Sequence, residues 1–161
     1  MRKEKLPELI SEIKDELELV ELLVADIEEV RKTIPKSSKA KGVYEESLAL
    51  KLHNFYTGCE RIFLRVVDDI NGGVSRSQDW HKRLLKSMSL EIENIRPPVI
   101  LKSTAKDLEE FLAFRHVGRN IYGFEIDSER LKTLISKVEG VYEKFRKDIE
   151  KLLRFLRKMA G

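Results

Sequence analysis

Apolar residues recur at alternating steps of four and three along much of this 161-residue chain, and this spacing constrains the fold more than any other feature. In the first such stretch, charged residues fill the intervening positions, which places the apolar side chains on one face of a helix. Spacing of this kind is typical of a helix that packs nearly antiparallel against its neighbours. The recurring residues of this first seam are Leu6, Ile10, Ile13, Leu17, Val20, Val24, Ile27 and Ile34.

Helix-breaking residues set the predicted ends of the first two helices. Pro35 stops the first helix, because proline cannot continue the helical hydrogen-bond ladder, and residues 36–42 supply a polar connection. Residues 71–73, with the sequence Asn-Gly-Gly, end the second helix, since glycine adopts left-handed backbone conformations at little cost. The seam of this second helix consists of Leu48, Leu52, Phe55, Cys59, Ile62, Val66 and Ile70.

Two further helices are predicted in the middle of the chain. A shorter one covers about residues 78–93. Residues 96–98, with the sequence Arg-Pro-Pro, then force an extended connection, because a residue before proline avoids the helical region. The next helix, the fourth, begins near Ser103 or Thr104, which are suitable N-caps, and continues through Tyr122.

The last helix is capped by Asp127 or Ser128, and its seam consists of Leu131, Leu134, Val138, Tyr142, Phe145, Ile149, Leu152 and Leu156. No segment alternates with the period of two that a half-buried strand would show. The sequence therefore predicts an all-α fold, an up-and-down bundle of four long helices and one short helix that forms a single domain over residues 1–161. We expect its core to contain Ile13, Leu17, Val20, Phe55, Cys59, Ile62, Phe114, Val117, Ile121, Phe145 and Ile149.

Composition narrows the class of protein. Hydrophobic residues make up 42% of the chain, yet charge interrupts every apolar run well before the ~20 residues of a membrane span. The first residues lack the apolar segment and the small-residue cleavage site of a signal peptide. The single cysteine, Cys59, cannot form an internal disulfide, which indicates a cytoplasmic protein. The net charge of +3 does not by itself imply a nucleic-acid partner.

The sequence lacks the common enzyme motifs. It has no glycine-rich phosphate loop, no nucleophile elbow and no paired cysteines or histidines at metal-ligand spacing. The three histidines, His53, His81 and His116, fall on three different predicted helices, so we expect neither a metal nor a cofactor. His81 follows Trp80 at the start of a helix, a position more typical of packing and capping than of chemistry. Cys59 lies on a core seam and should be an inert thiol.

The fourth helix presents two different faces. At about 100° per residue, an apolar stripe that should face the core contains Phe114, Val117, Ile121 and Phe124. A largely separate face carries Arg115, Arg119 and Tyr122, flanked by His116 and Asn120 and continued by Leu108, Phe111 and Leu112. Either both arginines pair with carboxylates of a neighbouring helix, or they form a phosphate site, because guanidinium binds phosphate oxygens bidentately.

The stretch from Phe114 to Asp127 resembles the active-site helix of the HEPN superfamily, and most closely that of HepT-like toxins. Their pattern is Arg, four residues, His, one residue, Tyr, so Arg115 falls on the motif arginine and Tyr122 on the motif tyrosine. Three further segments resemble this branch and occur in the same order. They are Tyr56-Thr57-Gly58-Cys59-Glu60-Arg61-Ile62-Phe63, Asp79-Trp80-His81 and Ile95-Arg96-Pro97.

The resemblance implies cleavage of RNA without a metal ion. The arginine, here Arg115, would hold a phosphate, while the motif histidine would assist attack by the ribose 2′-OH. That histidine is replaced by Asn120, which cannot exchange a proton near neutral pH. His116, one turn earlier, could serve instead, since imidazole titrates in the useful range, or it could be a flanking surface residue.

The resemblance also implies an assembly and a partner. Two chains would form a homodimer with their fourth helices facing across a cleft, so that Arg115 and Arg119 of both chains bind RNA. Because Leu108, Phe111 and Leu112 are too hydrophobic to be left in water, we expect them at that interface. The partner would be a minimal nucleotidyltransferase, the antitoxin of a type VII-like toxin–antitoxin pair. In this family it silences the toxin by attaching AMP to the motif tyrosine, here Tyr122.

In a second hypothesis, the chain has the same fold but no catalytic activity. The chain would then be a non-catalytic helical partner, or substrate-binding subunit, of the nucleotidyltransferase, and Asn120 is the residue that favours this alternative. The basic last helix fits either hypothesis, because a run of positive charge is either a solvated face or a guide for RNA. Its basic residues are Lys144, Arg146, Lys147, Lys151, Arg154, Arg157 and Lys158.

Overall fold

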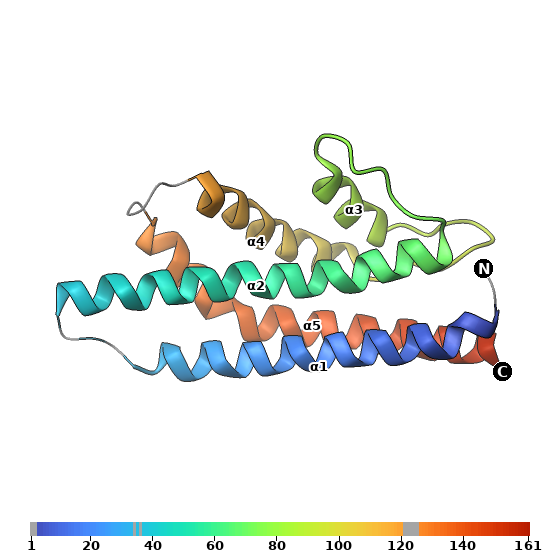
Figure 1. Cartoon of the computed structure of the whole chain (residues 1–161), viewed down its shortest axis with the longest axis horizontal. Coiled ribbons are helices and arrows are strands. Elements are labelled where there is room, and N and C mark those ends of the chain that lie inside the picture. The colour runs from blue at the N-terminus through green and yellow to red at the C-terminus, as the bar shows by residue number, and fades with distance from the viewer. Residues whose placement is uncertain (1–2, 34, 36, 121–125) are drawn as a thin grey trace.

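Five α-helices make up most of the computed structural model, which describes residues 3–33, 35, 37–120 and 126–161, with the backbone alone for residues 38 and 116–120. A short 3-10 turn, η1 (Lys3–Lys5), precedes them (Figure 1). The helices are α1 (Leu6–Arg31), α2 (Ser38–Ile70), α3 (Trp80–Met88), α4 (Lys102–Asn120) and α5 (Ser128–Ala160). The structure is 80% helical and the described residues form no strand, which confirms the predicted all-α bundle.

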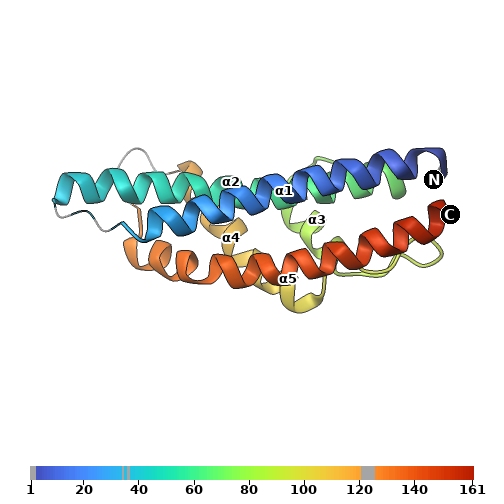
Figure 2. The same cartoon turned by 90° about the horizontal axis from the view of Figure 1, so that it is seen from below.

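The long helices run alternately up and down the bundle. Helices α1 and α2 form an antiparallel pair, and α5 lies along α1, as both views show (Figures 1 and 2). Helices α3 and α4 lie on the opposite side of α2 from α1, with α4 also contacting α5. None of the helices in the described part of the chain is long and apolar enough to cross a membrane.

Buried side chains from all five α-helices form one continuous hydrophobic core. Aromatic rings connect its layers: Phe55 of α2 meets Phe111 of α4 edge to face, with ring centres 5.2 Å apart, and Phe63 meets Phe145 of α5 at 5.9 Å. Two predicted core residues, Val117 and Ile121, lie outside the described side chains. The rest of the predicted core is confirmed as buried: Ile13, Leu17, Val20, Phe55, Cys59, Ile62, Phe114, Phe145 and Ile149.

Helices α1 and α2 pack closely at Gly58. A Cβ atom at this position would lie 2.7 Å from Cγ2 of Val20, so the absence of a side chain allows the two backbones to pack. Ion pairs flank the same contact, with Lys51 Nζ 2.7 Å from Asp26 Oδ2 and Arg65 Nη1 2.8 Å from Glu12 Oε2. The α1–α2 pair therefore combines an apolar seam with a charged edge.

The start of α2 differs from the prediction. Residues 36–42 were expected to be a polar connection, yet α2 begins at Ser38, ten residues before Leu48, the first seam residue. Ser37 caps the helix by accepting a hydrogen bond from the Ala40 amide at 3.1 Å. Polar residues disfavour a helix only where the fold would bury them. The first part of α2 is largely exposed, so it can be helical although its apolar seam begins later.

Helix α3 is shorter than predicted, because backbone turns bound it on both sides. Asp79 adopts a left-handed conformation with φ of 61° immediately before Trp80, and Asn94 does so with φ of 64°. After Met88 the chain folds into a tight turn in which Ile92 and Arg96 form an isolated antiparallel bridge. The apolar pattern continued across this turn, which is why the prediction extended the helix to residue 93.

A single buried arginine fixes the region that follows α3. Arg96 donates from Nε to Asn71 Oδ1 at 3.1 Å, from Nη1 to the Leu90 carbonyl at 3.0 Å, and from Nη2 to the Ser87 carbonyl at 3.3 Å. Its guanidinium therefore joins the end of α2 to the end of α3 and to the chain beyond it. These bonds hold α3 against α2.

A carboxylate caps the start of each of the last two helices, α4 and α5. Asp148 of α5 accepts from the Leu101 amide at 3.0 Å and from Thr104 Oγ1 at 2.6 Å, so a side chain distant in sequence caps α4. Asp127 accepts from the Arg130 amide at 3.1 Å, which confirms the predicted cap of α5. Both contacts satisfy amides that a helix start leaves without intrahelical partners.

Candidate functional site

Arg115, the residue predicted to bind phosphate, is buried on α4, with a side chain only 4% exposed. Its Nη1 lies 3.4 Å from Glu60 Oε1 and 3.4 Å from Thr57 Oγ1, both on α2. Its Nη2 lies 2.8 Å from Nδ1 of His81 on α3. Of the two alternatives for the arginines, pairing with a carboxylate of a neighbouring helix therefore holds for Arg115.

His81 connects this arginine to the surface. Its Nδ1 lies 2.7 Å from Glu60 Oε2, and its side chain is 18% exposed, against 6% for Glu60. The Trp80 ring stacks on the imidazole, with centroids 3.6 Å apart, and the Arg76 guanidinium lies 5.0 Å from the Trp80 ring centre. The sequence predicted packing or capping for His81; the side chain does pack on Trp80, and it also belongs to a charged cluster.

Helical spacing and the position of α3 bring these groups together. Tyr56, Thr57 and Glu60 lie within four residues on α2, so their side chains share the side of that helix that faces α3 and α4. The left-handed Asp79 and the buried Arg96 fix where α3 begins and how it sits on α2. The cluster of Glu60, His81 and Arg115 is thus assembled from three helices.

Two buried polar atoms in this cluster lack a hydrogen-bond partner among the described residues: Tyr56 Oη and Arg115 Nε. The Arg115 guanidinium also lies 5.0 Å from the centre of the Tyr56 ring. Burial, together with the nearby Glu60 carboxylate, raises the pKa of Tyr56, so its phenol is neutral. Unpaired buried polar atoms cost free energy, and natural proteins tolerate few of them, which marks this cluster as a candidate site rather than ordinary packing.

Several predicted site residues lie outside what the structure describes. Arg119, His116 and Asn120 have helical backbones at the end of α4, but their side chains are not described, and Tyr122 falls in residues 121–125, which are not described at all. Their predicted roles in binding, proton transfer and AMP attachment therefore stay predictions. Arg115 alone of the predicted site can be placed in its surroundings.

The apolar residues predicted at a dimer interface belong to the core of the single chain. Leu108, Phe111 and Leu112 are 0%, 2% and 2% exposed, and Phe111 packs against Phe55 of the same chain. The argument that these side chains need a second copy to cover them was wrong, because α2 and α5 cover them already. The error came from treating a wide core-facing surface of α4 as two separate faces.

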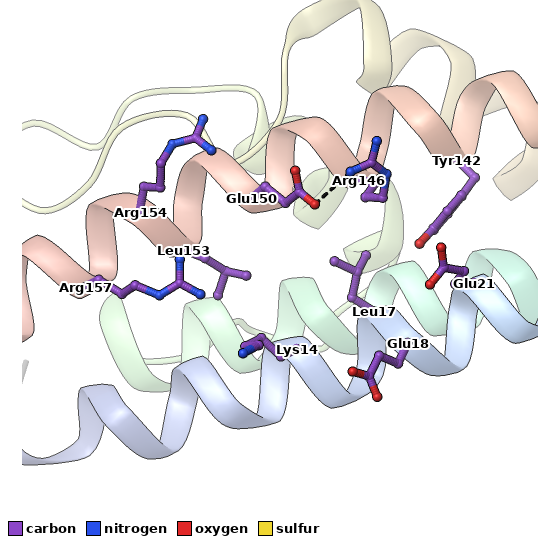
Figure 3. A pocket seen from close by; sticks show the side chains of 10 residues that line it. All are labelled: Lys14, Leu17, Glu18, Glu21, Tyr142, Arg146, Glu150, Leu153, Arg154 and Arg157. Atoms are coloured by element: carbon purple, nitrogen blue, oxygen red, sulfur yellow. Dashed lines mark hydrogen bonds and ion pairs between the residues drawn. The ribbon is translucent and has the colours of Figure 1, made fainter.

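The basic character of α5 is partly neutralised. Lys144 pairs with Asp107, and Arg146 pairs with Glu143 and Glu150 of its own helix. A groove of about 520 Å³ lies between α1 and α5, where Figure 3 shows Lys14 across from Arg157. Among the described residues neither of these cations, nor the neighbouring Arg154, has a carboxylate within 4.0 Å. This groove is formed by other helices than the Arg115 cluster.

Cys59 and the acidic residues offer no alternative chemistry in the described part of the chain. No group of three or more His, Cys, Asp or Glu side chains there is arranged to hold a metal ion. Cys59 is fully buried, and burial raises the pKa of its thiol, so it is not a reactive nucleophile.

The segments that meet at Arg115 are those that carried the resemblance in the sequence. Glu60 lies in the segment from Tyr56 to Phe63, His81 ends the segment that begins at Asp79, and Arg115 begins the motif itself. Because these segments occur in the order typical of the family, the sequence could have predicted that they belong to one site. It could not show that Glu60 and His81 contact Arg115, because they are 55 and 34 residues from it along the chain.

An antiparallel helical bundle with a buried arginine of α4 at the meeting point of three helices is the class of domain expected for the HEPN superfamily. The family model described as HepT-like protein matches residues 47–156, which covers α3, α4 and most of α2 and α5. The chain therefore belongs to the HepT-like family. Neither a curated protein nor a solved structure matches it.

Proposed function

We propose that this chain is the toxin of a toxin–antitoxin pair and that it cleaves RNA without a metal ion. The observation that carries the proposal is the cluster of Glu60, His81 and Arg115, in which the motif arginine meets a proton-exchanging side chain. Family membership supports the choice of RNA as substrate, since the HepT-like resemblance includes the arginine motif. The chemistry would occur where α2, α3 and α4 converge.

Arg115 would act through its charge. Cleavage of a phosphodiester passes through a transition state with more negative charge on the phosphate than the ground state carries. A guanidinium held in a poorly solvated place stabilises that charge without having to reorganise. Glu60, Thr57 and His81 hold Arg115 in this way. Pairing of this kind adds little to folding stability, because burying both charges costs about as much as their attraction returns.

The remaining roles follow the family pattern. Arg119 would provide a second phosphate contact, and His116 or Asn120 would lie next to the reacting ribose. A minimal nucleotidyltransferase would attach AMP to Tyr122 and so block the site. Two copies would face each other through their fourth helices, as the resemblance implies.

The alternative is a non-catalytic helical partner of that nucleotidyltransferase. Two observations favour it: Asn120 stands where the motif has a histidine, and Arg115 is only 4% exposed, so phosphate does not reach it directly from solvent. In that case the cluster would stabilise α4 for contact with the partner. The two functions differ in one observable, which is cleavage of RNA by the purified chain.

The test is a cleavage assay on structured and unstructured RNA with excess EDTA. Arg115→Ala should reduce the rate by about two orders of magnitude or more, comparable to losing one positioned donor. Arg115→Lys should restore little, because an ammonium lacks the planar fork of guanidinium. Arg83→Ala, on an exposed part of α3, is the control and should cut at the wild-type rate.

The same assay separates the two functions. Asn120→His should raise the rate if position 120 takes part in proton transfer, and His116→Ala should lower it only if His116 replaces the motif histidine. Should wild type and Asn120→His both leave all RNAs intact, the nuclease is excluded. Tight binding to a minimal nucleotidyltransferase would then establish the partner subunit.

A further inference from the structure

We infer that His81, positioned by Glu60, is the proton-transfer group of this site and takes the role that the motif gives to position 120. The inference rests on the proposed ribonuclease function and deepens it. His81 lies on α3, outside the arginine motif, so the motif alone does not identify it.

The contacts of the imidazole nitrogen Nδ1 allow either neutral tautomer of His81. Its Nδ1 lies between a carboxylate oxygen of Glu60 at 2.7 Å and a guanidinium nitrogen of Arg115 at 2.8 Å. With a proton on Nδ1, the ring donates to Glu60. Without that proton, Nδ1 accepts from Arg115. Nδ1 therefore has a hydrogen-bond partner in either neutral tautomer, and the tautomer that donates to Glu60 gives up the bond from Arg115.

Glu60 also selects the useful tautomer. When Nδ1 carries the proton and donates to the carboxylate, the lone pair of the neutral ring is on Nε2, which is then the basic nitrogen. Proton uptake at Nε2 gives an imidazolium that the buried Glu60 carboxylate stabilises. A carboxylate that orients a histidine and stabilises its cation is the recurring arrangement of hydrolytic sites.

Exposure distinguishes His81 from its neighbours. Its side chain is 18% exposed, whereas Glu60 and Arg115 are 6% and 4% exposed, so a phosphodiester arriving from solvent meets the imidazole first. Among the described side chains, Glu60 of α2 and Arg115 of α4 contact the ring, and the Arg76 guanidinium lies over the Trp80 ring that stacks on it. The Arg115 guanidinium lies 2.8 Å from the imidazole, so its positive charge would be next to a phosphate that contacts His81.

The proposed step is balanced in atoms and charge. His81 removes the proton of the ribose 2′-OH, the O2′–P bond forms, and the P–O5′ bond breaks. The departing O5′ takes a proton from solvent, and the imidazolium returns its proton to solvent. The products are a 2′,3′-cyclic phosphate and a free 5′-OH, and no oxidant, reductant or metal is consumed.

The first arm of the test measures RNA cleavage in EDTA from pH 5 to pH 9. For wild type, the rate should rise with pH and then level as His81 loses its proton. His81→Asn should cut at least about a hundredfold more slowly at pH 7.5 and lose that pH dependence, because a general base contributes about 10²–10⁴ in rate. His53→Asn is the matched control on α2, and it should keep both the wild-type rate and its pH profile.

Glu60→Gln tests the positioning residue. The amide keeps the shape of the side chain but cannot stabilise the imidazolium, so its cleavage rate should fall about tenfold. The acidic limb of its profile should also move to lower pH, because the protonated ring loses its carboxylate partner. A merely structural role would lower the rate without moving the limb.

The second arm needs no activity. Trp80 is the sole tryptophan and stacks on His81, so its fluorescence should report protonation of that ring, since an imidazolium quenches indole emission. The emission of wild type and His53→Asn should change with pH as the His81 ring gains its proton. His81→Asn should show no such change while keeping its circular dichroism and thermal unfolding curve.

The outcomes distinguish failure of the role proposed for His81 from failure of the proposed ribonuclease function. Cleavage by wild type that persists within threefold in His81→Asn, with an unchanged pH profile, overturns the role of His81 and leaves the ribonuclease standing. Absence of cleavage by wild type and by Asn120→His overturns both. A flat Trp80 fluorescence titration in wild type also overturns the role of His81, because its ring would not exchange protons in the required range.

Discussion

Two arginines are buried in the described part of this protein, and their surroundings differ in kind. Arg96 directs all of its hydrogen bonds to neutral oxygens of Asn71, Ser87, Leu90 and Pro97, and burial lowers the pKa of its guanidinium. Arg115 instead faces a carboxylate and an imidazole, and its Nε lacks a partner among the described residues. A fully satisfied arginine is a structural group, whereas a partly satisfied one beside titratable groups is a candidate for function.

Substitution of Arg96 should therefore act on stability. Arg96→Ala leaves several buried carbonyl oxygens without donors, so we expect the free energy of unfolding to fall by about 3 kcal/mol or more. Arg83→Ala, which removes an exposed arginine that bonds Ser77, should cost less than about 0.5 kcal/mol. Urea unfolding followed by circular dichroism measures both. Equal effects of the two substitutions would show that Arg96 does not join α2 to α3.

Burial of Cys59 predicts a loss of stability in alkali. Its pKa is raised above the ordinary value of 9.0, so the folded chain keeps a proton that the unfolded chain releases. The contribution is therefore complete below about pH 9 and is lost as pH rises further, by about 1.4 kcal/mol per pH unit for one group. Unfolding in urea at pH 8 and pH 10 should show a steeper loss for wild type than for Cys59→Ala. Parallel losses would contradict the burial of the thiol.

At the scale of helices, the contact of α1 with α2 depends on Gly58. Alanine is the better helix former, yet a Cβ at this position would lie 2.7 Å from the stiff, branched side chain of Val20. Gly58→Ala should therefore destabilise the protein by about 1–3 kcal/mol, as overpacked cores do. Gly140→Ala, in α5 with nothing within 4 Å of its Cβ, should stabilise it by about 0.5–1 kcal/mol.

Thermal unfolding of these two variants, and of Gly58→Ala combined with Val20→Ala, measures the effect. The double variant should recover part of the loss, because the shortened Val20 side chain makes room for the new methyl group. If Gly58→Ala stabilises the protein as Gly140→Ala does, the two helices are farther apart than described.

The helices that the sequence predicted best are those whose ends and faces depend on local residues. The seam of α5 and the cap at Asp127 were correct, since apolar spacing and capping chemistry act within a few residues. The seam of α1 was correct except at Ile10, which is only partly buried, while Ile34 lies outside the described residues. The predicted start of α4 missed Asp148, because that cap comes from another helix. The ends of α3 were missed because left-handed Asp79 precedes the helix and the chain leaves it after Met88, although the apolar pattern continues.

As with the helices, the part of the site that depends on local sequence was predictable, and the part that depends on packing was not. The motif identified Arg115, and its helix was correct, but helical periodicity could not tell that this residue turns toward α2 and α3. Glu60 and His81 were present in the segments that resemble the family, yet contact between them depends on how three helices pack. The periodicity of a single helix therefore cannot predict that Glu60 contacts His81.

For the whole molecule, α2 separates a scaffold from a site. Helices α1 and α5 pack against one part of α2, while α3 and α4 lie on its other side and bring His81 and Arg115 to Glu60 (Figure 1). Because Leu108, Phe111 and Leu112 are used inside the chain, the homodimer that we predict must form through other residues. The arrangement places the candidate chemistry on one side of a rigid pair of long helices.

The central claim is that this site cuts RNA by attack of the 2′-OH without a metal ion. The most direct measurement is the chemical nature of the RNA ends made by the wild-type protein in excess EDTA. The account predicts fragments with 2′,3′-cyclic phosphate and 5′-OH ends, absent when the 2′-OH at the cut is replaced by hydrogen and greatly reduced with Arg115→Ala. Fragments with 3′-OH ends, or cleavage that survives loss of the 2′-OH, would contradict it.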